Sequence, residues 1–174
     1  MFYRIKQVWW ALSAGPLSEA DRARVDELLS AAEKELFFKF TINDQNHSIR
    51  VVSHLIKQSH TNRSLLKAAL LHDVGKTKVG RLSVIDRSVA VAVKGLFPKV
   101  SQAWGAGELH QAKRFHLPSI VQMQHAEWGA DWVQAAGGDA LTVSLIRRHQ
   151  SKMREIVSEE DYFLMLLQTA DDLS

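Results

Sequence analysis

The amino-acid sequence predicts an all-α fold, a compact bundle of several helices. Apolar residues recur at helical spacing in one segment after another, and no segment shows the alternation of polar and apolar residues that is typical of a strand. Residues that commonly cap helix N-termini precede three of these segments, at Ser18, Asp139 and Ser158. Only 3 prolines and 9 glycines occur in 174 residues, so little of the chain has the composition of a linker. One structural domain accounts for a chain of this length.

Four helices are expected in the first half of the chain. Gly15-Pro16 ends the first of them, because this pair breaks a helix. Ser18, with Asp21 three residues later, is a variant of the capping box, and the apolar positions that follow predict one helix through Leu36. The four expected helices cover residues 2–12, 18–36, 41–58 and 62–72.

The second half is expected to form four more helices after a loop bracketed by Gly75 and Gly80. Pro98 ends the first of these helices, and Pro118 suits the first turn of the second. Residues 99–116 show the least regular pattern. The expected helices cover residues 83–96, 118–136, 139–150 and 158–173.

Composition and charge restrict the function. The chain has no cysteine, so disulfides and thiolate metal sites are excluded and a metal ion would need His, Asp or Glu ligands. No apolar run approaches the ~20 residues of a membrane span, and the charged N-terminus does not have the pattern of a signal peptide. We therefore expect a cytoplasmic protein with no membrane partner. The net charge is +3 and the basic residues are scattered, which favours a small anionic partner such as a phosphate over nucleic acid.

The most specific segment is residues 68–76, Ala-Ala-Leu-Leu-His-Asp-Val-Gly-Lys. Four apolar residues predict a helix that is buried on nearly all sides, and His72 and Asp73 follow directly. Burial of such a pair is costly unless the two groups are hydrogen-bonded, paired or bound to a metal. Imidazole and carboxylate together suit a divalent metal ion, and the alternative is an ordinary polar helix end. Gly75 is expected to let the chain turn sharply, and Lys76 adds a cation.

Two other helices carry polar residues that need an explanation. At 100° per residue, one side of the helix over residues 41–58 carries a stripe made up of Asp44, His47, Arg50, Val51 and His54. In the last helix, Asp171 falls on the same side as Leu164 and Leu167, so a carboxylate lies on a core-facing stripe. Metal binding is one reason for such a carboxylate. A solvent-facing stripe and an exposed helix end are the alternatives.

These residues resemble the motifs of the HD-domain superfamily of metal-dependent phosphohydrolases, which is named for its His-Asp pair. His72-Asp73 matches that pair, the His47 segment with its Arg50-Val51 resembles the first motif, and Ala170-Asp171 resembles the closing Ala-Asp. His54 is the rival first ligand but lacks the Arg-Val that follows His47. The resemblance covers roughly residues 44–172. We therefore assign residues 41–174 to an HD-type domain and residues 1–40 to an N-terminal helical extension packed on its core.

The resemblance implies a site for a divalent metal ion with four ligands, namely His47, His72, Asp73 and Asp171. The ion could be manganese, iron, cobalt, nickel, magnesium or zinc. Water activated by the metal would attack a phosphorus atom, with Asp73 both as a ligand and as a hydrogen-bond partner of that water. Lys76 and Arg50 would bind the phosphate oxygens of the substrate, and Lys76 would thereby also assist catalysis.

Two further histidines stay open as ligands of a second metal ion. In HD branches with two metals, extra histidines come from similar regions of the chain. His125 begins a His-x-x-x-Gly pattern, and His149 ends its predicted helix. The alternative is that both are helix-end or surface residues. No Gly-Tyr-Pro segment follows His149, so the chain departs from the branch that hydrolyses cyclic dinucleotides.

The sequence therefore predicts a phosphohydrolase that acts on a phosphomonoester or a phosphodiester, with a nucleotide as the expected substrate. The alternative is a non-catalytic HD module for ligand sensing or partner binding. The presence of all four expected ligands favours the enzyme. Whether residues 1–40 cover the core, form a homodimer or close the site is left open.

Overall fold

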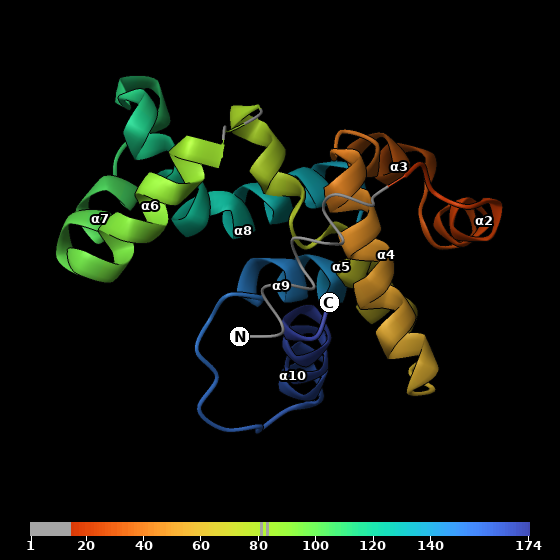
Figure 1. Ribbon diagram of the computed structural model, residues 1–174. Coiled ribbons are helices and arrows are strands. Elements are labelled where there is room, and N and C mark those ends of the chain that lie inside the picture. Colours follow the sequence, from red (N-terminus) through yellow and green to blue (C-terminus); the bar gives the residue numbers. More distant parts are fainter. Residues whose placement is uncertain (1–14, 81, 83) are drawn as a thin grey trace.

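The computed structural model describes residues 15–80, 82 and 84–174, and every regular element within these ranges is helical (Figure 1). The all-α prediction is thereby confirmed. The α-helices are α2 (Glu19–Leu28), α3 (Ala31–Phe37), α4 (Ile42–Lys57), α5 (Arg63–Leu71), α6 (Val84–Leu96), α7 (Pro98–Gly105), α8 (Leu117–Ala135), α9 (Ala140–Arg148) and α10 (Glu159–Asp172). Short 3₁₀ helices accompany them, namely η1 (Val74–Val79), η2 (Leu109–Gln111) and η3 (Arg114–His116). The helix expected over residues 2–12 lies outside the described residues.

Helix α5 forms the centre of the bundle. Six of its nine residues are buried, namely Leu65, Leu66, Ala68, Ala69, Leu70 and Leu71. The helices packed around it are α2, α3, α4, α9 and α10. Because α5 is covered on all sides, the polar residues that follow its last turn enter the interior of the protein. None of the helices within the described ranges combines the length and the apolar character that crossing a membrane requires.

Helices α6 and α7 form a layer of their own against the first part of α8 (Figure 1). Helices α7 and α8 approach each other closely at Gly105, where a Cβ atom would lie 3.0 Å from the Ser119 carbonyl oxygen. Within the described part of the chain, the main hydrophobic cluster draws its side chains from α2–α5 and α8–α10 and takes none from α6 or α7. Helix α8 therefore joins the core to this outer layer.

Side-chain caps determine where the helices that carry the candidate site begin. The Thr41 hydroxyl accepts a hydrogen bond from Asp44 N and starts α4. Asn62 Oδ1 accepts one from Leu65 N and starts α5. Each cap satisfies a backbone N–H that the first turn leaves without a partner. With its start fixed at Asn62, α5 ends at Leu71, and His72 becomes its C-cap.

Two expectations from the sequence are wrong. The single helix expected from Ser18 to Leu36 is divided, since the chain turns to an extended conformation at Leu29 and α3 begins after Ser30. A full capping box causes this restart, with Ser30 and Glu33 each accepting a hydrogen bond from the backbone N–H of the other. The supposedly irregular stretch over residues 99–116 contains most of α7, which Pro98 starts from its first turn.

Helices α2 and α3 are joined to α5 by polar contacts, one of which is buried. Lys67 Nζ lies 2.5 Å from Glu33 Oε1, and the Glu33 side chain is 1% exposed. Arg63 donates hydrogen bonds to the carbonyl oxygens of Glu27 and Leu28, at 2.6 and 3.0 Å. Phe37 is fully buried in the same core as α5. The part of residues 1–40 that the structure describes therefore contributes to the main core.

We predict that Lys67→Met destabilises the protein by about 3 kcal/mol or more, because it leaves the Glu33 carboxylate buried without its cation. Lys34→Met is the matched control. Lys34 pairs with Asp26, whose side chain is 62% exposed, and loss of such a surface pair costs less than about 1 kcal/mol. Urea unfolding of the two variants measures the difference. Equal losses of stability would contradict the role assigned to the Glu33–Lys67 pair.

Candidate metal centre

The buried end of α5 places His72 and Asp73 in the interior. The His72 side chain is fully buried and Asp73 is 7% exposed. His72 Nε2 faces two carboxylates, at 3.5 Å from Asp73 Oδ2 and 3.4 Å from Asp171 Oδ1. Both distances lie at the outer limit of hydrogen bonding, so this buried nitrogen has no close hydrogen-bond partner among the described residues. Such a nitrogen is rare in a folded protein and favours a ligand role.

The expected ligands converge on Asp73 in two groups. In the first group, one ligand atom each of His47, His72 and Asp73 lies within 4.8 Å of the others. In the second, the same holds for Asp73, His125 and His149. Asp73 belongs to both groups, since its Oδ2 faces His72 and its Oδ1 lies 3.2 Å from His125 Nε2. The carboxylate of Asp73 is thus oriented as a bridge.

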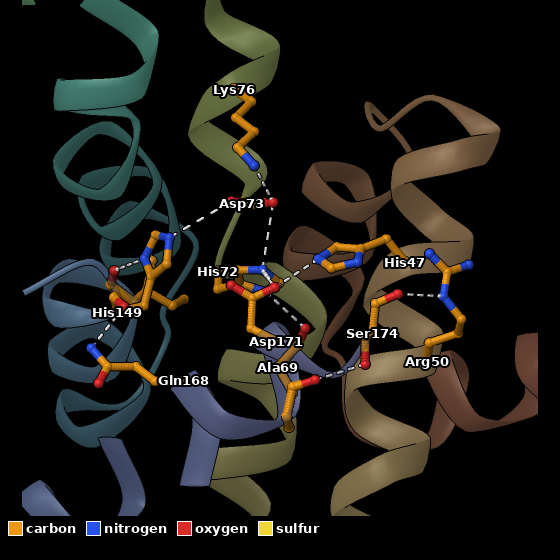
Figure 2. Close-up of polar contacts among 12 residues, drawn as sticks. His47, Arg50, Ala69, His72, Asp73, Lys76, His149, Gln168, Asp171 and Ser174 are labelled. Carbon is orange, nitrogen blue, oxygen red and sulfur yellow. Dashed lines mark hydrogen bonds and ion pairs between the residues drawn. The ribbon is translucent and has the colours of Figure 1, made fainter. Parts of the chain in front are cut away.

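Asp171 completes the first group from α10. Its Oδ1 lies 2.9 Å from His47 Nε2, and Figure 2 shows the carboxylate between the rings of His47 and His72. The resemblance to the closing Ala-Asp motif implies a ligand at Asp171 rather than Asp172, and in the structure Asp171 contacts these two histidines. Asp171 therefore adds a fourth side chain, from α10, beside the three residues of the first group.

Backbone carbonyl groups orient three of the imidazole rings in the same way. Nδ1 of His72 lies 3.1 Å from Ala69 O, and Nδ1 of His125 and His149 each lie 2.7 Å from the carbonyl oxygens of Val121 and Ile146. A carbonyl oxygen only accepts, so Nδ1 carries the proton in each ring. In the neutral rings, Nε2 is then left with a free lone pair directed at the centre. This arrangement is typical of histidines that bind metal ions.

In the second group, atoms that accept hydrogen bonds face one another. His125 Nε2 and His149 Nε2 are 3.2 Å apart, and Asp73 Oδ1 lies 3.2 and 3.7 Å from them. Burial lowers the pKa of the His149 imidazole and so disfavours a proton there. Lone pairs and a carboxylate at these distances repel one another unless a cation lies among them. The second group therefore has the electrostatics of a cation site.

The first group also stabilises a positive charge, here a proton on His72. Burial alone would lower the pKa of His72, but Asp73 and Asp171 outweigh it and raise the pKa to about 9. Burial likewise opposes ionisation of Asp171, yet a hydrogen bond from His47 and the nearby His72 hold the pKa of this carboxyl well below its ordinary value. The two carboxylates thus keep a proton on a fully buried imidazole, and a metal ion would supply the same positive charge.

Lys76 lies beside the centre and forms an ion pair with Asp73 Oδ2. Burial opposes ionisation of Asp73, but Lys76 and His72 together hold the pKa of its carboxyl well below the ordinary range. The same attraction raises the pKa of Lys76 against the effect of its own burial. The side chain of Lys76 remains 42% exposed, so its ammonium group faces both the centre and the space outside it.

Gly75 brings the two groups together by a close approach between backbones. A Cβ atom at Gly75 would overlap the His125 carbonyl oxygen and lie 2.8 Å from Gly129 N, so only glycine lets η1 pack on α8 here. The φ angle of Gly75 is not positive, and the reason expected from the sequence, a sharp turn, is replaced by this packing. His125 is one helical turn before Gly129, which explains the His-x-x-x-Gly pattern in physical terms.

Arg50 contacts the backbone just beyond the end of α10. Its Nε donates a hydrogen bond to the Ser174 carbonyl oxygen at 3.1 Å (Figure 2). The Ser174 hydroxyl in turn donates to Ala170 O. Arg50 therefore secures the end of α10, one turn away from Asp171. That Arg50 binds a phosphate of the substrate stays a prediction. His54, the rival first ligand, belongs to neither of the two groups.

Two cavities open beside the centre. The first, named the lysine pocket, has a volume of about 470 Å³, and its lining includes Lys39, Asp44, Lys76 and Lys94. The second, named the outer cleft, has a volume of about 670 Å³, and its lining includes Arg147, His149, Ser151 and Asp171. Cations in both linings suit an anionic ligand. The centre is thus accessible from two sides.

Comparisons with known proteins return no match. No protein-family model matches the chain, no curated protein does, and no solved structure does. We therefore base the functional proposal on the residues and geometry of the centre.

We predict that the wild-type protein holds about two transition-metal ions per chain, one in each group. His72→Ala and His149→Ala should each lose one ion, whereas Asp73→Ala should lose both because its carboxylate serves both groups. His110→Ala is the control, since that side chain is 73% exposed and remote from the centre. Elemental analysis after incubation with manganese or nickel and desalting measures the content. Equal metal content in Asp73→Ala and the wild type would refute the shared role of Asp73.

We also predict that Gly75→Ala destabilises the protein by at least about 2 kcal/mol, because its methyl group overlaps the backbone of α8. Gly95→Ala is the matched control. Gly95 lies in α6 with open space around the position of a Cβ atom, so alanine there should stabilise by about 0.5–1 kcal/mol. Thermal and urea unfolding compare the two variants. A Gly75→Ala protein as stable as the wild type would show that the close approach is dispensable.

Proposed function

We propose that the protein is a cytoplasmic, metal-dependent phosphohydrolase of the HD type that hydrolyses phosphate ester bonds with water, and that its substrate is a nucleotide or a related small phosphate ester. The observation that carries the proposal is the pair of buried His/Asp groups that share Asp73. The buried Nε2 of His72 has no hydrogen-bond partner among the described residues, which favours a ligand role over a purely structural one. The resemblance to the HD motifs supports the same reaction.

The donor set fits a pair of divalent metal ions. Imidazole nitrogens and carboxylate oxygens suit manganese, iron, cobalt, nickel and zinc, and fit magnesium less well because that ion prefers oxygen ligands. His47, His72, Asp73 and Asp171 would hold one ion, and Asp73, His125 and His149 the other. When bound, the metal would polarise the phosphoryl group and increase the acidity of a water molecule.

The residues of the chain perform the other steps. Asp73 accepts a hydrogen bond from the attacking water and orients it toward phosphorus. Lys76, which is paired with Asp73 and lines the lysine pocket, attracts the oxygens of the phosphoryl group. The buried carbonyl partners of His72, His125 and His149 keep the rings in place, so that little reorganisation is needed when the substrate binds.

We predict that Asp73→Ala lowers the hydrolysis of a phosphate ester by roughly 100-fold or more, since it removes a group common to both halves of the centre. Asp26→Ala is the control, because Asp26 is exposed on α2 far from the centre. The measurement is phosphate-ester turnover with manganese, cobalt or nickel, with circular dichroism to verify that the helical content is unchanged.

Two outcomes would reject the proposal. Full activity in a folded Asp73→Ala variant would remove this carboxylate from the mechanism. Wild-type protein that binds metal but hydrolyses no phosphate ester with any of these ions would favour a non-catalytic HD module for ligand sensing or partner binding.

A further inference from the structure

The two cavities meet at the centre from different sides. The lysine pocket reaches it through Asp44 and Lys76, and the outer cleft reaches it through His149 and Asp171. Both cavities share one wall, which is formed by Lys94, Ser101, Ser119 and Gln122. This wall belongs to α6, α7 and the first turns of α8. A ligand held between Lys76 in the lysine pocket and His149 and Asp171 in the outer cleft therefore has room for one group in each cavity.

The shared wall contains a polar group without a partner. Ser119 is 5% exposed, and its buried Oγ has no hydrogen-bond partner among the described residues. Buried hydroxyl groups are nearly always hydrogen-bonded, and a ligand is one of the partners that can satisfy them. Ser119 lines both cavities, at the place where a ligand would pass from one to the other.

We infer that the substrate is a phosphodiester, with one organic substituent in the lysine pocket and the other in the outer cleft. The inference rests on the proposed function and narrows it. A phosphomonoester has one substituent and would leave one cavity to solvent, whereas a phosphodiester has two substituents that leave phosphorus in different directions. The lysine pocket has a volume of about 470 Å³ and the outer cleft one of about 670 Å³, so each has room for a group of the size of a nucleoside or a sugar.

The reaction balances without a further reactant. The oxygen of water forms a bond to phosphorus, and the bond from phosphorus to one ester oxygen breaks. The leaving oxygen takes up a proton that the water has released, so the products are an alcohol and a phosphomonoester.

The positive side chains of Lys39, Lys76 and Lys94 make the lysine pocket suited to a substituent that carries hydroxyl or anionic groups.

The first test compares two probes with the same leaving group, bis(p-nitrophenyl) phosphate and p-nitrophenyl phosphate, in the presence of manganese. We expect kcat/KM to be at least tenfold higher for the diester. Equal or faster hydrolysis of the monoester would overturn the inference and leave the proposed phosphohydrolase standing. Hydrolysis of neither probe would count against the proposed function, and binding would then decide the inference.

Where neither probe is hydrolysed, binding is measured by calorimetry on the full chain loaded with manganese, because the bound metal is expected to free Lys76 for the phosphate. We expect the diester to bind at least tenfold more tightly than the monoester. Similar affinities for the two probes would overturn the inference.

A substitution in the outer cleft adds a spatial test. Ser151 is exposed after α9 and lines this cleft, so Ser151→Trp should fill it and raise both KM and Kd for the diester about tenfold. The matched control is Thr61→Trp, an exposed position between α4 and α5 that lines neither cavity. The ratio of diester to monoester affinity should fall in Ser151→Trp and not in Thr61→Trp. Equal ratios in both variants would refute the placement of a substituent in the outer cleft.

Discussion

The arrangement of the centre depends on one packing constraint, the contact of the Gly75 backbone with α8. No side chain fits between η1 and the backbone at His125 and Gly129, and Asp73 is only two residues before the contact. The contact therefore fixes the position of the Asp73 carboxylate relative to the His125 ring. Asp73 is attached to α5 through His72, so the same contact ties α8 to the centre of the bundle. Without it, the two His/Asp groups would have no common residue.

The charges around the Asp73 carboxylate also determine the properties of the centre. A carboxylate that is 7% exposed costs free energy to bury, and here the charges of Lys76 and His72 offset the cost. The first group retains positive charge on His72, whose pKa is raised to about 9. The second group has no comparable source of charge, because burial lowers the pKa of His149. A cation would therefore reduce the electrostatic repulsion most in the second group. For this reason, a centre with two ions fits the geometry better than a single ion bound in the first group.

Much of this could be predicted from the sequence because helices have a fixed period. The stripe that includes His47 and the core-facing position of Asp171 follow from 100° per residue. His47 belongs to the first group, and Asp171 contacts it. The parts that were missed depend on contacts across the fold. The division of the expected helix by the Ser30–Glu33 capping box was missed, because the apolar positions continue at helical spacing through Leu36. The close approach at Gly75, and the carbonyl groups that orient the rings, arise only when α5, α8 and α9 are packed together.

The two cations near the centre show why residue type alone does not assign a role. Arg50 and Lys76 were both expected to bind phosphate, yet Arg50 Nε donates to Ser174 O and so steadies the helix end that presents Asp171. Lys76 instead contacts Asp73 and also lines the lysine pocket. A divalent ion bound at Asp73 would neutralise the carboxylate and weaken its attraction for Lys76. In the proposed mechanism, the ammonium group would then be available to the phosphoryl oxygens of the substrate, so that binding of a metal ion would also prepare Lys76 to bind the phosphate.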